Sequence, residues 1–258
     1  MENKSGSMNE KMFSQEHDTE RTINKKDNKA KNEVLTYIRD YRVMTNLKYR
    51  LITNILIPFL AIFTSMLIAC SKTIWAWIGV IVIVYDFYMM CGMFTFQLIM
   101  SMDVSELIQS TSLKKKLQIY IPVMSSTVIN LVVFTFLVIE RVILIQNSVA
   151  DKKQLIFTLF TLDVELLTVY LYTSICYKYY VLGFIVFMVL FMGVFTVFSG
   201  AAFVPVSNAV FKLGLPVVAL LGYIAIFAGG ALEILIGELL YKKPLSEFAF
   251  RGFFRDAK

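Results

Sequence analysis

Acidic side chains occur inside the long apolar runs of this sequence, where a charge is costly. They are Asp86, Asp163, Glu165, Glu233 and Glu238. On insertion scales, a charged side chain near the centre of a membrane-spanning helix costs about 2.5–3.5 kcal/mol. Such a group therefore pairs with another helix, lies at a subunit contact or lines a hydrated path. A path lined by acids would suit a cationic or amphipathic substrate.

These acids differ in what their positions allow. Asp163 and Glu165 are two residues apart, so a helix points them about 200° from each other and they cannot share one cavity. Glu238 lies near the end of its apolar run, where a long side chain can reach water. Asp86 follows Tyr85, and Glu233 follows a pair of glycines. The candidates for a translocation path or a subunit interface are Asp86, Asp163, Glu165 and Glu233.

Other chemistry is absent from the sequence. The three cysteines, Cys70, Cys91 and Cys176, lie in apolar segments without C-x-x-C spacing, which argues against a disulfide framework or a zinc site. The single histidine, His17, lies in a polar tail, so histidine-based metal or acid–base chemistry is not expected. No G-x-x-x-x-G-K-[ST] motif is present, so the chain is not itself a P-loop ATPase. We expect no catalytic residues, no metal and no bound cofactor.

The elements that carry the acids are expected to be membrane-spanning helices. The chain is 57% hydrophobic and 17% charged, against about a quarter charged in soluble domains. A helix needs about 20 predominantly apolar residues to cross a bilayer. The sequence predicts an all-α membrane protein with six transmembrane helices, at residues 51–70, 74–98, 118–143, 155–177, 181–200 and 216–240. The transmembrane domain as a whole covers residues 51–243.

Polar segments flank this domain. Residues 1–32 are charged and nearly free of aromatic residues, which predicts a disordered cytoplasmic tail. Residues 33–50 place apolar side chains three or four apart between basic ones, which predicts an amphipathic interfacial helix before the first span. A helix packed on soluble protein is the alternative. Residues 244–258 are expected to form a cytoplasmic C-terminal tail.

The positions of lysine and arginine predict the orientation. Most of the 25 basic residues lie before residue 51, in the loop 99–117 or after Tyr241. Because cytoplasmic loops carry the excess of lysine and arginine, both termini are expected in the cytoplasm of a multi-pass cell-membrane protein. The anionic inner leaflet then accounts for the net charge of +6, and no nucleic-acid partner is needed.

The cytoplasmic loop 101–117 has a pattern of its own. Acids come first, then an apolar pair, small hydroxyl residues and a lysine triplet. The residues are Asp103, Glu106, Leu107, Ile108, Ser112, Leu113, Lys114, Lys115 and Lys116. The apolar pair could project from a short helix into a groove of a partner. A basic loop that only fixes topology is an equal alternative.

With these residues, the chain resembles the membrane subunits of the ABC-2 exporter family. In that family an interfacial helix precedes span one, and the loop between spans two and three forms a coupling helix that touches the ATPase. The matching positions here are Asp103, Leu107 and Ile108, followed by Ser112 to Lys116. The basic, aromatic end, Leu239 to Lys243, is also similar. The usual proline before the basic stretch is replaced by Gln109-Ser110-Thr111, which leaves subfamily and substrate open.

The resemblance implies partners. A separate P-loop ATPase subunit would bind ATP and Mg²⁺, and a second permease subunit, a copy or a relative, would complete the path in the lipid bilayer. It also implies short re-entrant helices in the connection 201–215, where a plain loop is the alternative. Two other functions fit the sequence: an ion-coupled secondary carrier that uses the intramembrane acids, and a non-catalytic membrane immunity or sensor protein.

Overall fold

The computed structural model describes residues 32–33, 35–41, 51–69, 115–148, 151–176, 179–199 and 203–241. The predicted span 74–98, the tails 1–31 and 242–258, and loop residues 101–114 lie outside the described residues. The chain divides into two units, Met1–Met44 and Thr45–Lys258, and each is described by itself. All regular structure in the described residues is helical, which confirms the all-α prediction for them.

In the first unit, residues 35–41 form a helix within the predicted interfacial segment. Its apolar side chains Leu35 and Ile38 are exposed. The Thr36 hydroxyl donates to the carbonyl of Asn32, one turn earlier and 2.8 Å away.

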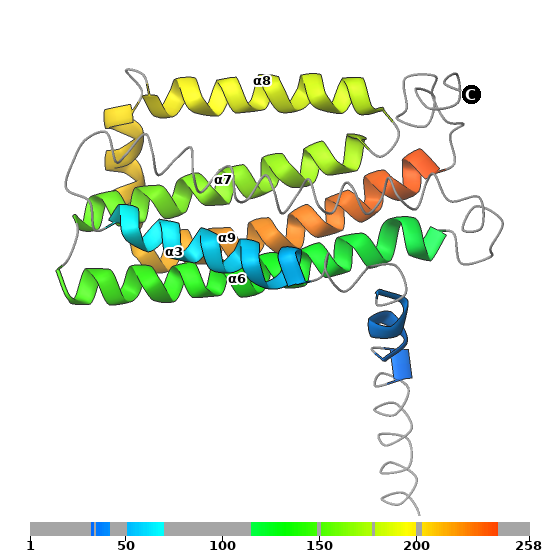
Figure 1. Cartoon of the computed structure of the whole chain (residues 1–258). Coiled ribbons are helices and arrows are strands. Elements are labelled where there is room, and N and C mark those ends of the chain that lie inside the picture. Colours follow the sequence, from blue (N-terminus) through cyan, green and yellow to red (C-terminus); the bar gives the residue numbers. More distant parts are fainter. Residues whose placement is uncertain are drawn as a thin grey trace, which may run out of the picture. The chain divides into compact units, whose positions relative to one another are not determined.

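The second unit is a bundle of long helices. They are α3 (Ile57–Ala69), α6 (Ile121–Gln146), α7 (Lys152–Cys176), α8 (Tyr180–Ser199) and α9 (Phe203–Tyr241) (Figure 1). Within the described residues, three stretches are long and apolar enough to cross a membrane: Lys116–Gln146, Lys152–Ile175 and Val204–Tyr241. Their limits agree within a few residues with predicted spans three and four, and the last one extends well before predicted span six.

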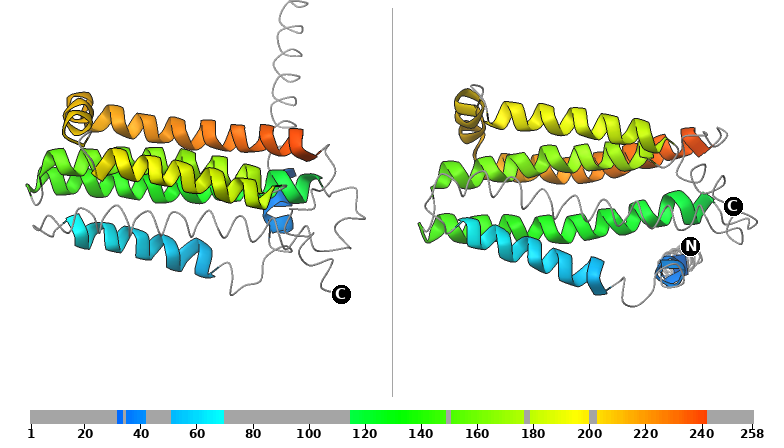
Figure 2. Two further views of the ribbon diagram at one scale, coloured as in Figure 1. Left: turned by 90° about the horizontal axis from the view of Figure 1, so that it is seen from above. Right: turned by 45° about the horizontal axis from the view of Figure 1, so that its top comes forward.

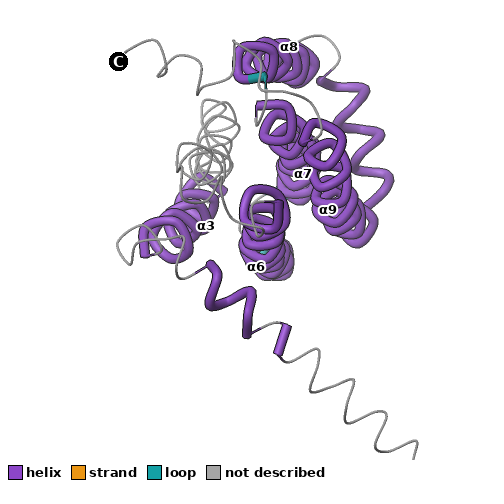
Figure 3. The backbone as a smooth tube through the Cα atoms, turned by 90° about the vertical axis from the view of Figure 1, so that its right-hand side faces the viewer, coloured by secondary structure: helices purple, strands orange, loops and turns teal. Residues whose placement is uncertain are grey.

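Helix α7 is the centre of the bundle. It packs against α6, α8 and α9, and α3 packs against α6. Seen along the bundle, α7 lies between α8 and the pair α6 and α9 (Figure 3). The core joins α6, α7 and α9 through one cluster of buried apolar side chains: Val133, Phe134, Leu137, Ile156, Phe157, Leu159, Leu162, Leu166, Tyr170, Val210, Val218, Ala219 and Ile226. The outward faces carry exposed apolar side chains such as Phe136, Val189 and Phe227.

Two wide helical turns precede prolines. η1 (Ile52–Leu56) ends one residue before Ile57-Pro58, and η2 (Lys116–Tyr120) ends one residue before Ile121-Pro122. In each, the N–H after the turn donates to the carbonyl five residues back, from Ile57 to Ile52 and from Ile121 to Lys116. A proline inside a helix has no N–H and crowds the carbonyl four residues earlier. The wider turn is the form in which both helices accommodate their prolines.

Helix α9 is broken at Gly214, whose φ of 78° and ψ of 164° lie outside the helical region. Residues 203–213, here called the crosswise segment, run across the end of the bundle, and residues 215–241 run along it (Figures 1 and 2). Glycine adopts this φ without the strain that a Cβ adds, and Pro216 follows two residues later. Of the two predictions for the connection 201–215, the structure has a helix over residues 203–213.

Candidate functional site

Polar side chains are concentrated inside the bundle, along α7. The buried ones on this helix are Thr158, Thr161, Asp163, Glu165, Thr168, Thr173 and Ser174. The hydroxyls satisfy their own hydrogens: Thr161, for example, donates to the Phe157 carbonyl one turn back at 3.0 Å, and Thr168 donates to Val164 at 3.0 Å. This back-bonding lets an interior helix carry hydroxyls without a partner on another helix. Among the described residues, both carboxyl oxygens of Asp163 are without a hydrogen-bond partner.

Asp163 lies against two neighbouring helices. It is 4% exposed, and neither carboxyl oxygen has a hydrogen-bond partner among the residues that the structure describes. A Cβ placed on Gly222 of α9 would lie 2.4 Å from the Asp163 Oδ1 and 2.0 Å from the ring of Phe134 on α6. Gly222 is therefore the position at which α9 can approach Asp163 and Phe134 this closely. The predicted acid is thus buried in the contact between α6, α7 and α9.

Glu233 lies on α9, in a second polar layer. It is 3% exposed, and within the described part of the chain neither carboxyl oxygen has a hydrogen-bond partner. One turn earlier, Gly229 packs on the Tyr170 ring, where a Cβ would come within 2.4 Å. On the α6 side, the Asn130 amide donates to the Tyr170 hydroxyl at 3.0 Å. This layer therefore combines a carboxyl from α9, a phenol from α7 and an amide from α6.

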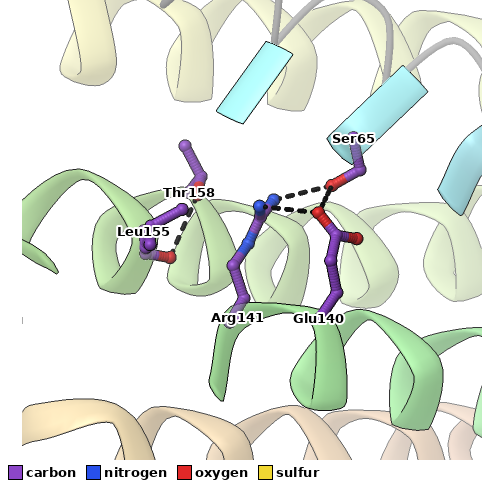
Figure 4. Close-up of polar contacts among 5 residues, drawn as sticks. All are labelled: Ser65, Glu140, Arg141, Leu155 and Thr158. Atoms are coloured by element: carbon purple, nitrogen blue, oxygen red, sulfur yellow. Dashed lines mark hydrogen bonds and ion pairs between the residues drawn. The ribbon is translucent and has the colours of Figure 1, made fainter. Parts of the chain in front are cut away.

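A buried ion pair lies nearer the other end of α6. Arg141, 1% exposed, donates to Glu140 at 3.2 Å and to the Ser65 hydroxyl of α3 at 2.8 Å. Both charged side chains point from α6 toward Ser65 (Figure 4). Ser65 also donates to Glu140, at 3.3 Å. The cluster ties α3 to α6, and one atom of each charged group, Arg141 Nε and Glu140 Oε2, is left without a partner.

Another polar cluster joins the beginning of the α6 stretch to the end of α9. Lys115 Nζ lies 2.9 Å from Glu238 Oε1, and the Tyr120 hydroxyl also donates to that oxygen. The hydrogen bond to Glu238 raises the pKa of Lys115 above its ordinary value of 10.5, against the opposing effect of desolvation. Both partners of the ion pair are about two-fifths exposed. Glu238 therefore reaches the bundle end and finds a cation from another helix.

The sequence-predicted residues fall into two groups. The structure describes Asp163, Glu165, Glu233, Lys115 and Lys116, and it buries all three acids among them. Asp163 and Glu165 are both buried although they point in different directions, because α7 has neighbours on several sides. The other predicted residues lie outside the described residues: Asp86, Asp103, Glu106, Leu107, Ile108, Ser112, Leu113 and Lys114.

Sequence reasoning missed the partners of the charged groups. Arg141 and Glu140 lie within α6, which continues to Gln146, and both contact Ser65 of α3. A single arginine in an otherwise apolar run was the available signal, since an intramembrane cation is expected to have a buried partner. The pair of glycines before Glu233 allows a close helix approach, since Gly229 packs on Tyr170 and Gly230 on Thr127.

Within the part of the chain that the structure describes, no group of three or more histidine, cysteine, aspartate or glutamate side chains could hold a metal ion. Comparisons with protein-family models, curated proteins and solved structures find no match for this chain.

Proposed function

We propose that this chain is the membrane-spanning permease subunit of an ATP-driven exporter of the ABC-2 type. The observation that supports the proposal best is the interruption of α9 at Gly214, which sets the crosswise segment across the bundle end. The family that the sequence resembles carries short re-entrant helices at this point of the chain, where they cap the outer end of the path. In the proposal, the crosswise segment has that position.

The proposed topology has six spans. In the proposal, five of them would be formed by the described helical residues 51–69, 116–146, 152–176, 180–199 and 215–241. The remaining span is the apolar segment 74–98. The lysine and arginine distribution places both termini in the cytoplasm, so the bundle end with Lys115 and Tyr241 faces inward and the crosswise segment faces outward.

Coupling to ATP hydrolysis is assigned to the loop 101–117. Its last residues, Lys115 and Lys116, begin the helical stretch that continues into α6. A displacement of this loop by the ATPase would therefore move α6 directly. It would also move α9, through the contact of Lys115 with Glu238. ATP and Mg²⁺ would bind to the partner ATPase, and a second permease subunit would complete the path.

Association with an ATPase tests this proposal. The tagged chain is purified from its native membranes in mild detergent, and bound P-loop subunits and ATP hydrolysis are measured. We expect Leu107→Asp and Ile108→Asp to remove both. The matched control is Lys152→Asp, an exposed charge change at the opposite bundle end, which should leave both unchanged. Full ATPase association of the two loop variants would overturn the proposal.

Membrane sidedness gives an independent test. The three native cysteines are replaced by serine, and single cysteines are introduced at Lys116 and Lys152. In intact cells, a membrane-impermeant maleimide should label the cysteine at position 152 and not the one at position 116. Labelling of position 116 from outside would invert the topology and remove the coupling loop from the cytoplasm.

A second candidate, the ion-coupled carrier, is favoured by one observation. Asp163 and Glu233 are both more than nine-tenths buried, and none of the described residues forms a hydrogen bond with their carboxyl oxygens. A carrier would need no ATPase and would transport substrate in proteoliposomes that hold this chain alone. Inactivity under both proton and sodium gradients would remove this candidate.

A further inference from the structure

The surroundings of Glu233 are tightly packed. On its own helix, Gly229 and Gly230 lie one turn or less before it, and a Cβ on them would meet Tyr170 at 2.4 Å and the Thr127 hydroxyl oxygen at 2.8 Å. These contacts bring α6 and α7 directly onto α9 beside the carboxyl group. Glu233 is therefore enclosed on the sides of both neighbouring helices.

The hydroxyl next to Glu233 donates to the backbone of its own helix. The Thr173 side chain lies close to the carboxyl, but its hydrogen is directed at the backbone carbonyls of Val169 and Tyr170, at 2.9 and 3.1 Å. Among the described residues, neither Glu233 oxygen has a hydrogen-bond partner. The Thr173 oxygen keeps a lone pair, so it can accept a hydrogen from a protonated carboxyl.

No described cation neutralises Glu233. On the stretch that contains α6, Lys115 pairs with Glu238 and Arg141 pairs with Glu140. On α7, the titratable group that faces Glu233 is Tyr170, which is neutral as a phenol. On its own helix, Glu238 lies five residues further along and adds only another negative charge. An ionised Glu233 would thus be a buried charge without donors or a counter-ion, which is highly unfavourable.

From these contacts we propose that Glu233 is a proton-binding site in the interior of the bundle, occupied by a proton when α6, α7 and α9 pack as they do here. A proton needs no space, unlike an alkali ion, which suits the close contacts at Gly229 and Gly230. Protonation removes the negative charge of Glu233. It also makes the carboxyl group a hydrogen-bond donor, and the Thr173 oxygen can accept that hydrogen. The site takes up a proton as the helices close around it and releases the proton when water reaches it.

This inference does not depend on the ABC-2 proposal. It concerns the protonation of one side chain and can be measured without an ATPase, a substrate or a gradient. Loss of ATPase association would leave it intact, and an ionised Glu233 would leave the exporter proposal intact.

Infrared spectroscopy of the full chain in nanodiscs tests the proposal. The carbonyl stretch of a protonated carboxyl group is separate from the bands of a carboxylate, and a difference spectrum between wild type and Glu233→Gln isolates this residue. We expect a protonated-carboxyl band at neutral pH that Glu233→Gln removes and the matched control Glu238→Gln retains. A carboxylate band from Glu233 at neutral pH would overturn the proposal. Loss of the protonated band when sodium replaces choline would also overturn it, in favour of an alkali-ion site.

Thermal stability supplies a second measurement. If the folded chain holds the neutral acid, stability is greatest at low pH and falls as pH rises, because the unfolded chain ionises while the folded chain resists. The wild-type melting temperature should therefore fall with rising pH relative to Glu233→Gln, whose neutral amide mimics the protonated acid. Equal pH dependence in the two proteins would contradict the proposal. Failure of Glu233→Gln to fold would contradict it as well, since the native state would then require the charge.

Discussion

Helices α6 and α7 lie side by side, but the more apolar of the two is the less buried. An 18-residue apolar window of the α6 stretch, Lys116–Gln146, has a mean hydropathy of 2.4 and is 33% buried, whereas the corresponding window of the α7 stretch has a mean hydropathy of 1.6 and is 78% buried. In a soluble protein the less apolar helix would be the more exposed one. Here the most polar of the three candidate spans is the most enclosed.

The reason is whether a helix face contacts lipid or protein. A lipid-facing surface offers no hydrogen bonds, so polar groups have to be satisfied inside the protein. The outward face of α6 is accordingly apolar, with Val128, Val132 and Phe136 exposed. Asp163 and Glu165 lie on α7, where protein surrounds them on several sides. The comparison therefore predicts which substitutions the bundle tolerates.

The largest effect is expected from Arg141→Ala. Removing the guanidinium leaves Glu140 as a buried, uncompensated charge, which costs about 3–5 kcal/mol. The free energy of unfolding, measured by SDS titration in mixed micelles, should fall by this amount. The control is the double variant with Glu140→Leu and Arg141→Met, which removes both charges and should stay close to wild type. An equal loss in the double variant would show that the packing of these side chains, not the charge, stabilises the contact.

A matched pair on α6 tests its two faces. Phe134 is fully buried, whereas Phe136, two residues away, is 54% exposed. Phe134→Ala opens a cavity between three helices and should cost about 3 kcal/mol, at the low end for a buried phenylalanine. Phe136→Ala should change stability by less than about 0.5 kcal/mol, as outward positions generally do. The same unfolding titration compares the two, and equal losses would mean that the outward face of α6 is covered by something else.

Two glycines compare α9 with α8. A Cβ on Gly222 would collide with Phe134 and Asp163, whereas a Cβ on Gly193 of α8 would meet nothing within 4 Å. Gly222→Ala should destabilise by about 1–3 kcal/mol through overpacking. Gly193→Ala should be neutral, or stabilising by up to about 1 kcal/mol, because alanine favours the helix. Thermal unfolding of the two variants distinguishes them, and a stabilising Gly222→Ala would rule out the close approach of α9.

The smallest effect is expected at the exposed pair of Lys115 and Glu238. Because the pKa of Lys115 is raised, the pair contributes fully at pH values below the ordinary 10.5 and is lost as pH rises through the raised value. The difference in melting temperature between wild type and Lys115→Met should be small and constant up to about that pH, and should vanish above it. High salt should also reduce it. A difference that persists in strong alkali would assign the effect to the lysine stem.

The helices were the part of the fold most accessible from the sequence. Apolar length alone placed the span 118–143, which α6 and the preceding wide turn cover from residue 116 to residue 146. Hydropathy does not report which face of a helix meets protein, so it could not show that α7 is the enclosed one. The break in α9 was better signalled, since Gly214 and Pro216 stand together in the connection.

From the sequence, only the residues of the candidate site that are energetically costly to bury could be predicted. Asp163 and Glu233 stand out because a carboxyl in an apolar run needs an explanation. Their surroundings do not follow from local pattern. Arg141 and Ser65 are 76 residues apart in the chain, and Lys115 and Glu238 are 123 apart. Such contacts depend on how whole helices are placed, which no short window of sequence contains.

The break at Gly214 also bears on how the chain can change over evolution. In an unbroken helix, one inserted residue rotates everything beyond it by about 100°. Such a rotation would turn Gly222, Gly229 and Glu233 away from α7. Because the helical path restarts after Gly214, a change of length within residues 203–213 leaves the rotational register of residues 215–241 intact. Insertions and deletions should therefore accumulate before Gly214 among descendants of this sequence and be excluded after it.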